Sequence, residues 1–184
     1  MQNTRQQNLN LEEVSIRPYC AETIVNRFDC GVSPINNFLR NKAKKSERRC
    51  EHKVFCAHIG ASPTAIGYYA LQVGSDSVSE LPDANKAGYI KTYVAFPAIN
   101  LSFVGVHSEY HRQGLGSYLL MDAFSKVAKV AEFAGFYALT LVSYDEKSTE
   151  FYKSLKFAIY SENLQQPKML YPLEDLLAVV RAGQ

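Results

Sequence analysis

The sequence predicts an α+β fold, with a mixed and mostly antiparallel central sheet and helices on both of its faces. Two patterns predict this class. Apolar runs at 54–59 and 65–73 are separated by a turn rich in Gly, Ser and Pro, which is typical of a β-hairpin. Strand and helix patterns then alternate from residue 96 to residue 160, which favours a parallel strand–helix–strand unit with a right-handed crossover.

Length and composition narrow the class of protein. A chain of 184 residues with 47% hydrophobic residues can bury one core but is short for two, so we expect a poorly ordered polar N-terminus over 1–12 and one domain over 13–184. No stretch of about 18 apolar residues occurs, which predicts no membrane partner and a cytoplasmic location. The four cysteines and four histidines lack metal-ligand spacing, which predicts free thiols and no metal.

The first half of the chain carries these signals in order. Residues 16–19 read as a short strand, and Pro18 indicates that it lies at an edge or ends early. A turn at 28–31 precedes a helix for which Ser33 or Asp29 could be the N-cap. That helix carries apolar residues at helical spacing at Ile35, Phe38, Leu39 and Ala43. After the hairpin, residues 74–90 form a longer connection of a kind that often carries function.

The second half begins with a central strand over 96–106, in which Gly105 indicates a bulge or a close approach to a ligand. An apolar stripe from Leu119 to Ala131 predicts a helix that packs on the sheet and stops near Gly135. A buried strand over 137–142, a helix over 145–155 and a strand over 157–160 follow. Residues 173–180 form a terminal helix.

The stretch 104–119 links the central strand to this long helix through a glycine turn. Gly114 and Gly116 allow close approach of the backbone to a ligand, and the first N–H groups of the helix lie at the positive end of its dipole. The stretch could therefore hold a pyrophosphate, although a tight structural turn would use the same residues. It does not match the dinucleotide-binding or Walker patterns, because the third glycine and the lysine are missing.

A second feature is a concentration of positive charge in the first helix and just beyond it. The net charge of +2 is too small to identify a nucleic-acid binder by itself, so local clustering must carry that argument. Between residues 40 and 49, six cations stand against one acid, Glu47, which makes an anionic partner such as a phosphate backbone as strong a candidate as an ordinary solvated face. The six cations are Arg40, Lys42, Lys44, Lys45, Arg48 and Arg49.

Two segments resemble signatures of the GNAT acetyltransferase superfamily. Residues 111–116 are similar to its motif A, Gln/Arg-x-x-Gly-x-Gly/Ala, with His111 where Gln or Arg is usual. Residues 151–157 are similar to its Phe-Tyr-x-x-x-Gly-Phe signature, with Lys156 in place of the glycine. The resemblance implies a GNAT fold whose parallel strand–helix–strand unit binds acetyl-CoA. It assigns that binding to Val104, Val106, His111, Arg112, Gln113, Gly114, Leu115, Gly116 and Ser117.

The N-terminal region narrows the resemblance further. Phe28–Gly31 followed by Ile35–Arg40, together with Gly67–Leu71 and the strand that contains Pro97, is similar to the GNAT toxins of toxin–antitoxin modules. The similarity covers about residues 14 to 173. It implies acetylation of aminoacyl-tRNA, arrest of translation and a ribbon-helix-helix antitoxin as partner, with the six cations contacting tRNA. Whether the chain forms a homodimer stays open.

The same resemblance assigns catalytic roles. Tyr152 stands at the position of the general acid, and backbone N–H groups near Val106 would hold the thioester carbonyl. No carboxylate lies between residues 101 and 106, which leaves His107 and Glu109 as candidates for the base. At pH 7 an α-amine of pKa near 8 is roughly one-tenth neutral, against about one lysine amine in 2,500. The absence of a carboxylate from this strand therefore favours an α-amine as the acceptor, because water could serve as its base.

Two other functions fit the sequence less well. One is a general N-acetyltransferase of the same fold that acts on a small-molecule amine or a protein, in which case the basic helix is only a solvated face. The other is a non-catalytic module that senses acetyl-CoA, which the departures at His111 and Lys156 favour. The retained Tyr152 and the Gly114–Gly116 turn argue against that module.

Overall fold

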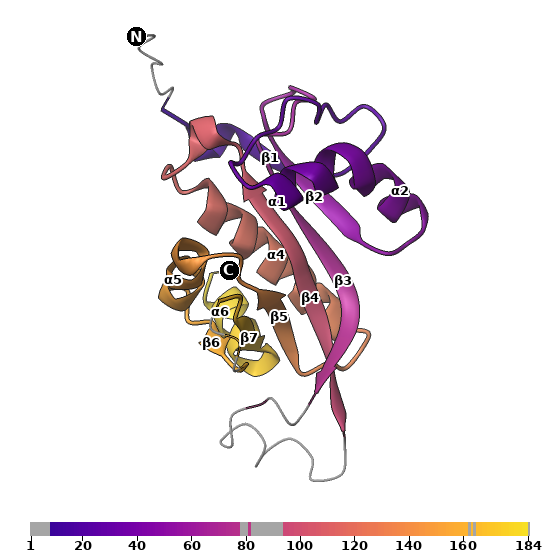
Figure 1. Ribbon diagram of the computed structural model, residues 1–184, viewed down its shortest axis with the longest axis vertical. Coiled ribbons are helices and arrows are strands. Elements are labelled where there is room, and N and C mark those ends of the chain that lie inside the picture. Colours follow the sequence, from indigo (N-terminus) through magenta and orange to yellow (C-terminus); the bar gives the residue numbers. More distant parts are fainter. Residues whose placement is uncertain (1–7, 78–80, 82–93, 162, 164, 184) are drawn as a thin grey trace. The chain divides into compact units, whose positions relative to one another are not determined.

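The computed structural model describes residues 8–77, 81, 94–161, 163 and 165–183. Its seven-stranded sheet has the strand order β1-β2-β3-β4-β5-β7-β6 (Figure 1). The β1–β2, β2–β3, β5–β7 and β6–β7 pairs are antiparallel and β4–β5 is parallel, which confirms the mixed α+β sheet. The strands are β1 (Val14–Pro18), β2 (Lys53–Ile59), β3 (Gly67–Ser77), β4 (Ala95–Val106), β5 (Ala138–Val142), β6 (Ala158–Ile159) and β7 (Lys168–Pro172).

The structure also describes α-helices and shorter helical turns. The α-helices are α1 (Ser33–Asn37), α2 (Ala43–Arg48), α4 (Leu115–Ala131), α5 (Glu146–Ser154) and α6 (Leu173–Ala182). Short 3₁₀ turns occur at η1 (Leu11–Glu13) and η4 (Ser108–Tyr110), and a π-helical turn, η2 (Phe38–Lys42), joins α1 to α2. Within the described residues, no helix combines the length and apolar character needed to cross a bilayer.

The chain divides into two compact units, Met1–Gln72 with Phe103–Ala123 and Val73–Ser102 with Phe124–Gln184. In the first unit, α1, η2 and α2 lie across β2 and β3 (Figure 1). Phe38, Leu39 and Ala43 pack there against Tyr68 and Ala70 of β3. Alternate residues of a strand point to opposite faces of the sheet. The neighbouring Gly67 and Tyr69 therefore face the other side, where α4 begins. A Cβ at Gly67 would lie 3.1 Å from Leu119, and the Tyr69 hydroxyl donates to the Asp122 carboxylate at 2.5 Å.

The second unit is built around β7. Tyr171 of β7 packs against Phe124 and Phe157 with ring centroids 4.9 and 5.2 Å apart. The next residue toward the N-terminus, Leu170, joins a buried cluster with Phe96 and others on the opposite face. β7 was not predicted, and it lies between β5 and β6.

Several local predictions need correction. Neither Ser33 nor Asp29 caps α1, because Ser33 is its first residue and Val32 its N-cap. Asp29 instead accepts hydrogen bonds from the Gly31 N–H at 2.9 Å and the Asn36 amide at 2.7 Å. The close approach at Gly105 comes from the chain itself, since a Cβ there would lie 2.8 Å from Ile35 and 3.2 Å from Phe28.

Three further predictions concern order, the long connection and cysteine. Residues 8–12, within the segment expected to be poorly ordered, have a defined conformation in which the Asn10 side chain caps η1. The connection predicted over 74–90 begins later, because β3 continues to Ser77, and most of the rest lies outside the described residues. All four cysteines are free thiols, as predicted.

Candidate active site

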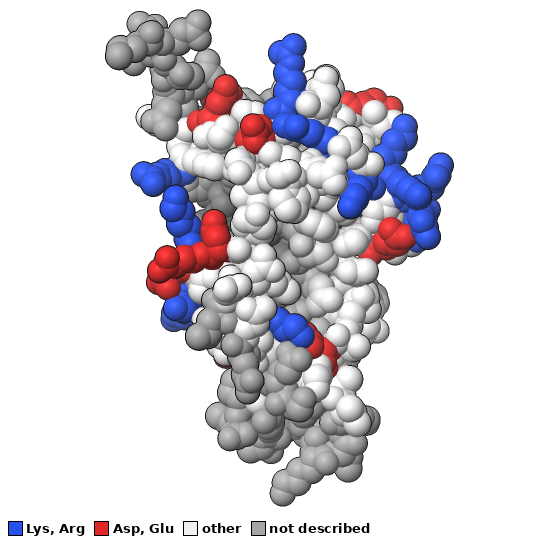
Figure 2. Space-filling view, viewed as in Figure 1, with Lys and Arg blue, Asp and Glu red and all other residues white. Residues whose placement is uncertain are grey.

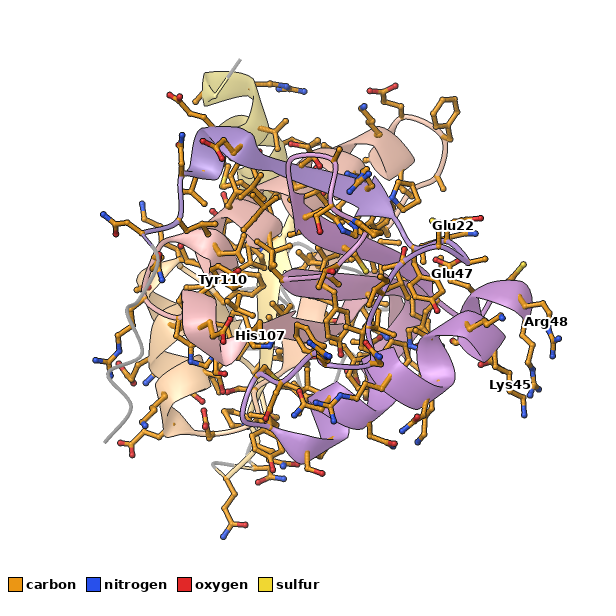
Figure 3. The ribbon with its side chains drawn as sticks, turned by 90° about the horizontal axis from the view of Figure 1, so that it is seen from above. Glu22, Lys45, Glu47, Arg48, His107 and Tyr110 are labelled. Atoms are coloured by element: carbon orange, nitrogen blue, oxygen red, sulfur yellow. The ribbon has the colours of Figure 1, made fainter. Side chains whose placement is uncertain are left out.

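The end of β4 is held in place by the turn that precedes α1. The His107 N–H donates to the Ile66 carbonyl at 2.8 Å, and the Ser108 N–H donates to the Asp29 carbonyl at 2.8 Å. The ring of Phe28 lies edge-on to His107 with centroids 5.9 Å apart. The strand therefore ends at a fixed point beside the 27–31 turn, and Figure 3 shows His107 there with Tyr110 next to it.

Both ring nitrogens of His107 are engaged by backbone groups. Its Nδ1 accepts from the Glu109 N–H at 3.3 Å, so Nε2 carries the proton and donates to the Arg27 carbonyl at 3.2 Å. A base needs a free lone pair directed at the proton that it removes. In this arrangement the lone pair of His107 is already used, and the imidazole clamps the turn to the strand.

The loop from His111 to Gly114 turns the chain into α4. Arg112 and Gly114 have left-handed backbone, with φ of +60° and +82°. The Tyr118 N–H makes the first helical bond, to the Gly114 carbonyl at 3.0 Å, so the N–H groups of the three residues before it have no acceptor within the helix. These groups belong to Leu115, Gly116 and Ser117.

Two predicted loop side chains shape the loop itself. The His111 Nε2–H donates to the Val106 carbonyl at 2.8 Å and so closes the loop onto the strand. The Gln113 amide donates to the Glu109 carbonyl at 3.0 Å and accepts from the Leu9 N–H at 2.6 Å. A Cβ at Gly114 would lie 3.3 Å from Leu11. The N-terminal segment thus packs on this loop, a contact between residues about a hundred positions apart that no local pattern indicates.

The loop has the features that a pyrophosphate needs. It presents successive N–H groups at the positive end of a 17-residue helix, with a glycine in left-handed conformation at the turn and the exposed Arg112 beside it. The N–H groups of Leu115, Gly116 and Ser117 could hold such a pyrophosphate. In the part of the chain that the structure describes, no group of His, Cys, Asp and Glu could hold a metal ion.

The basic residues are all exposed along η2, α2 and the C-cap of α2, and we call this group the basic surface: Arg40, Lys42, Lys44, Lys45, Arg48 and Arg49. Figure 2 shows Lys and Arg gathered over α2, and in Figure 3 Lys45 and Arg48 point outward from it. The Arg40 guanidinium donates to the Phe28 carbonyl, and Arg49 pairs with Glu51 at 2.9 Å. Among the described residues, the other four have no ion-pair partner.

Tyr152 belongs to the second unit and lies on α5. Asp145 caps this helix in a capping box with Ser148. The Tyr152 side chain is 9% exposed and packs against Phe151 and Phe157, with centroids 5.4 and 5.6 Å away. Burial, and then the negative charge of Asp145, raises the pKa of Tyr152. The phenol therefore stays protonated at every physiological pH, which a proton donor requires.

Comparison with known proteins identifies the family to which this chain is similar. The model of the acetyltransferase (GNAT) family matches residues 36–157. The probable toxin TacT of Sinorhizobium fredii (strain NBRC 101917 / NGR234) is 29% identical over 158 residues, which cover 83% of each chain. The solved structure of a Tyr-to-Phe mutant of KacT superposes with a TM-score of 0.83 at 20% identity, covering 91% of this chain and 99% of that one.

A second solved structure, AtaT complexed with acetyl-methionyl-tRNAfMet, gives a TM-score of 0.81 at 23% identity and covers 90% of this chain and 98% of that one. These likenesses show the GNAT fold. The family match spans both the glycine loop at the start of α4 and Tyr152 on α5. The chain belongs to the acetyltransferase (GNAT) family.

Proposed function

We propose that this enzyme acetylates the α-amine of the aminoacyl group on charged tRNA, and that it is a toxin that stops translation in the cytoplasm. The observation that carries the proposal is the basic surface. The family supplies an acetyl-transfer site, whereas a row of exposed cations selects a polyanionic acceptor. The relatives point the same way, because one is called a probable toxin and AtaT was solved with an acetylated aminoacyl-tRNA.

The charge balance of the first unit supports a polyanion. Glu47, the one acid within the segment, directs its carboxylate at β2, where it accepts from the Val54 N–H at 2.6 Å and pairs with Lys53 at 3.3 Å. It therefore lies against β2, whereas Lys44, Lys45 and Arg48 are exposed and have no ion pair within the described residues. Cations in this state can neutralise phosphates without first breaking an internal salt bridge.

The chemistry of the first unit favours an α-amine. Acetyl-CoA supplies an activated acetyl group, and the acceptor nitrogen must reach it without its proton. His107 has no free lone pair while it clamps the 27–31 turn, so we assign the removal of this proton to water and not to this imidazole. An α-amine of pKa near 8 can lose its proton to water at a useful rate, whereas a lysine amine near 10.4 is almost always charged.

The remaining roles follow from the assignments above. We assign Tyr152 the proton that the departing coenzyme A thiolate takes up when the carbon–sulfur bond breaks. The peptide N–H groups beside Val104 and Val106 are assigned to the thioester carbonyl. A phenol of ordinary pKa near 10 is a weaker acid than a thiol of pKa near 8.5, and burial raises the pKa of Tyr152 further, so this proton transfer is uphill and is driven by formation of the amide bond.

The partner assignments belong to the same proposal. AtaT was solved bound to the C-terminus of its antitoxin AtaR, and a KacTA–DNA complex has also been solved. We assign this chain an antitoxin partner of the ribbon-helix-helix class. Light scattering on the isolated chain and on the pair would give the stoichiometry and show whether the chain is a homodimer.

The first test is transfer of label from acetyl-CoA to a pool of charged tRNA, beside an uncharged pool, a peptide, a small amine and the Tyr152→Phe variant. Label on charged tRNA alone, reduced at least 100-fold by Tyr152→Phe, supports the proposal. Label on a peptide or small amine alone would establish the general acetyltransferase instead. Acetyl-CoA binding with no transfer to any amine would establish the sensing module.

The second test addresses the basic surface with matched variants. We expect the triple variant Lys44→Ala, Lys45→Ala, Arg48→Ala to bind tRNA more weakly and to flatten the slope of log K against log salt by about 2–3. The control replaces three cations that are equally exposed in the second unit, Lys129, Lys147 and Arg181, and should leave the slope unchanged. Equal effects from the two triples would show that only net charge matters and would contradict the assignment.

A further inference from the structure

A polar pocket of about 430 Å³ opens where α1 meets the π-helical turn. Its volume lies within the range of small-ligand sites. Its lining includes Asp29, Ser33, Asn36, Asn37, Arg40 and Asn41. No apolar side chain contributes, so an occupant must be recognised through hydrogen bonds.

Two side chains of the pocket present a paired donor and acceptor. The Asn41 amide N–H donates to the Asn37 side-chain oxygen at 2.8 Å, which places the two amides side by side on one face. This bond leaves the Asn37 NH₂ group as donor and the Asn41 oxygen as acceptor, and neither has a partner among the described residues. Adenine offers the complementary pair, because its N7 accepts and its N6 amino group donates on one edge.

The other side chains are held by the protein and set the charge of the pocket. Asn36 accepts from the Cys30 N–H at 2.9 Å and donates to Asp29 at 2.7 Å, so both ends of its amide are occupied. Hydrogen bonds from the Gly31 N–H and Asn36, and the charge of Arg40, lower the pKa of Asp29 and keep it ionised. The lining holds one carboxylate, Asp29, and one guanidinium, Arg40, whose charges balance, which favours a neutral base over a phosphate as the occupant.

The pocket lies between the basic surface and the end of β4. Arg40 belongs both to the pocket and to the basic surface, which continues along η2 and α2. On its other side, Asp29 accepts the Ser108 N–H through its carbonyl, directly after β4. A strand whose phosphates lie on the basic surface would thus bring its last base into the pocket and its 3′ end toward β4.

We propose that Asn37 and Asn41 read the terminal adenine of the acceptor RNA, so that this pocket positions the 3′-terminal nucleotide whose ester carries the amino acid. The inference rests on the proposed acetylation of charged tRNA. It adds a base-specific contact to the phosphate contacts of the basic surface, which carry no sequence information. Asn37 ends α1 and Asn41 lies in the π-helical turn, and such turns are frequent at functional sites.

The test uses short RNA hairpins charged with the same amino acid and ending in A, G, C or U. We expect wild-type kcat/KM for the A-ended hairpin to exceed the others by about 10- to 100-fold, the usual discrimination of a paired base contact. The double variant Asn37→Ala, Asn41→Ala should lose this preference by slowing only on the A-ended hairpin. Its affinity for acetyl-CoA should not change, and its melting temperature should match wild type, since both side chains are exposed.

The matched control is Lys45→Ala, which removes a phosphate contact of the basic surface. This variant should lower kcat/KM equally for all four hairpins and keep the preference for the A-ended one. Equal wild-type rates on the four hairpins, or a preference that survives in the double variant, would overturn the inference and leave the proposed function intact. Absence of acetylation on every hairpin would overturn both.

Discussion

Lys156 occupies a position that favours glycine, and the structure shows why. Its φ is +69°, in the left-handed region. The Lys156 N–H donates to the Lys153 carbonyl at 2.8 Å, and the Phe157 N–H donates to the Tyr152 carbonyl at 3.0 Å. This pair of bonds is a Schellman motif that ends α5, and the edge-on contact of the Phe157 ring with Tyr152 accompanies it. The GNAT signature has glycine here because the motif needs a residue with positive φ.

The substitution Lys156→Gly should therefore stabilise the protein. An L-residue pays about 1–2 kcal/mol in left-handed conformation. Glycine avoids that cost. It also gives the unfolded chain more conformational freedom, which offsets about 0.4–1 kcal/mol of the gain. Lys156 is exposed and has no ion pair among the described residues, so little else is lost. The net gain is about 0.5–1 kcal/mol, which raises the melting temperature by about 1–4 °C for a chain of this size.

Thermal unfolding followed by circular dichroism would measure this gain, with urea unfolding as a second measurement. The control is Lys156→Ala, which removes the same side chain but remains an L-residue, and it should melt within about a degree of wild type. The reasoning is refuted if Lys156→Gly melts no higher than Lys156→Ala. That result would mean that the left-handed backbone at the end of α5 carries no strain.

Three more predictions concern the proposed acetyl-CoA site and the acid. Gly114→Ala should raise the Kd for acetyl-CoA, measured by calorimetry, at least tenfold and leave tRNA affinity unchanged. A φ of +82° is strained for alanine, and the new Cβ would press on Leu11. Leu9→Pro should weaken acetyl-CoA binding several-fold, since it deletes the N–H that holds Gln113, whereas Leu9→Ala keeps that N–H and should bind nearly normally. The pH profile of kcat should rise as the α-amine, of pKa near 8, loses its proton, and then stay level to about pH 10. Burial and Asp145 raise the pKa of Tyr152, so the acid keeps its proton over that range, and a fall in kcat near pH 9 would contradict its role.

The sequence predicted those elements whose signal is local and repeated. The hairpin of β2 and β3, the central strand β4, the parallel pair β4–β5 and the apolar face of α4 all follow from periodicity, and each is confirmed. β7 was missed because it is five residues long and follows a polar stretch. Its place between β5 and β6 is decided by long-range packing of Tyr171 with Phe124, which no local pattern contains.

The candidate site shows the same limit. The glycine turn, the basic surface and Tyr152 were found because each is contiguous in sequence or belongs to a known signature. The hydrogen bond between His107 and Arg27 was not predicted, and neither was the contact of Leu9 with Gln113. Both join residues that lie far apart in the sequence. Aspartate favours the N-cap position, which makes Asp29 one of two cap candidates in the sequence, whereas in the structure its carboxylate accepts a hydrogen bond from Asn36 in the pocket lining.

Glu47 differs from the cations around it because it has a structural role within the fold. Packing of α2 accounts for this acid, because its carboxylate ties the helix to β2 through the Val54 N–H and Lys53. No comparable internal task accounts for Lys42, Lys44, Lys45 and Arg48, which make no ion pair or side-chain hydrogen bond with the described residues. Like charges gathered on one face repel one another and so weaken the folded state slightly. Folding therefore explains the acid but not the cations, which supports the proposed polyanionic acceptor over an ordinary solvated face.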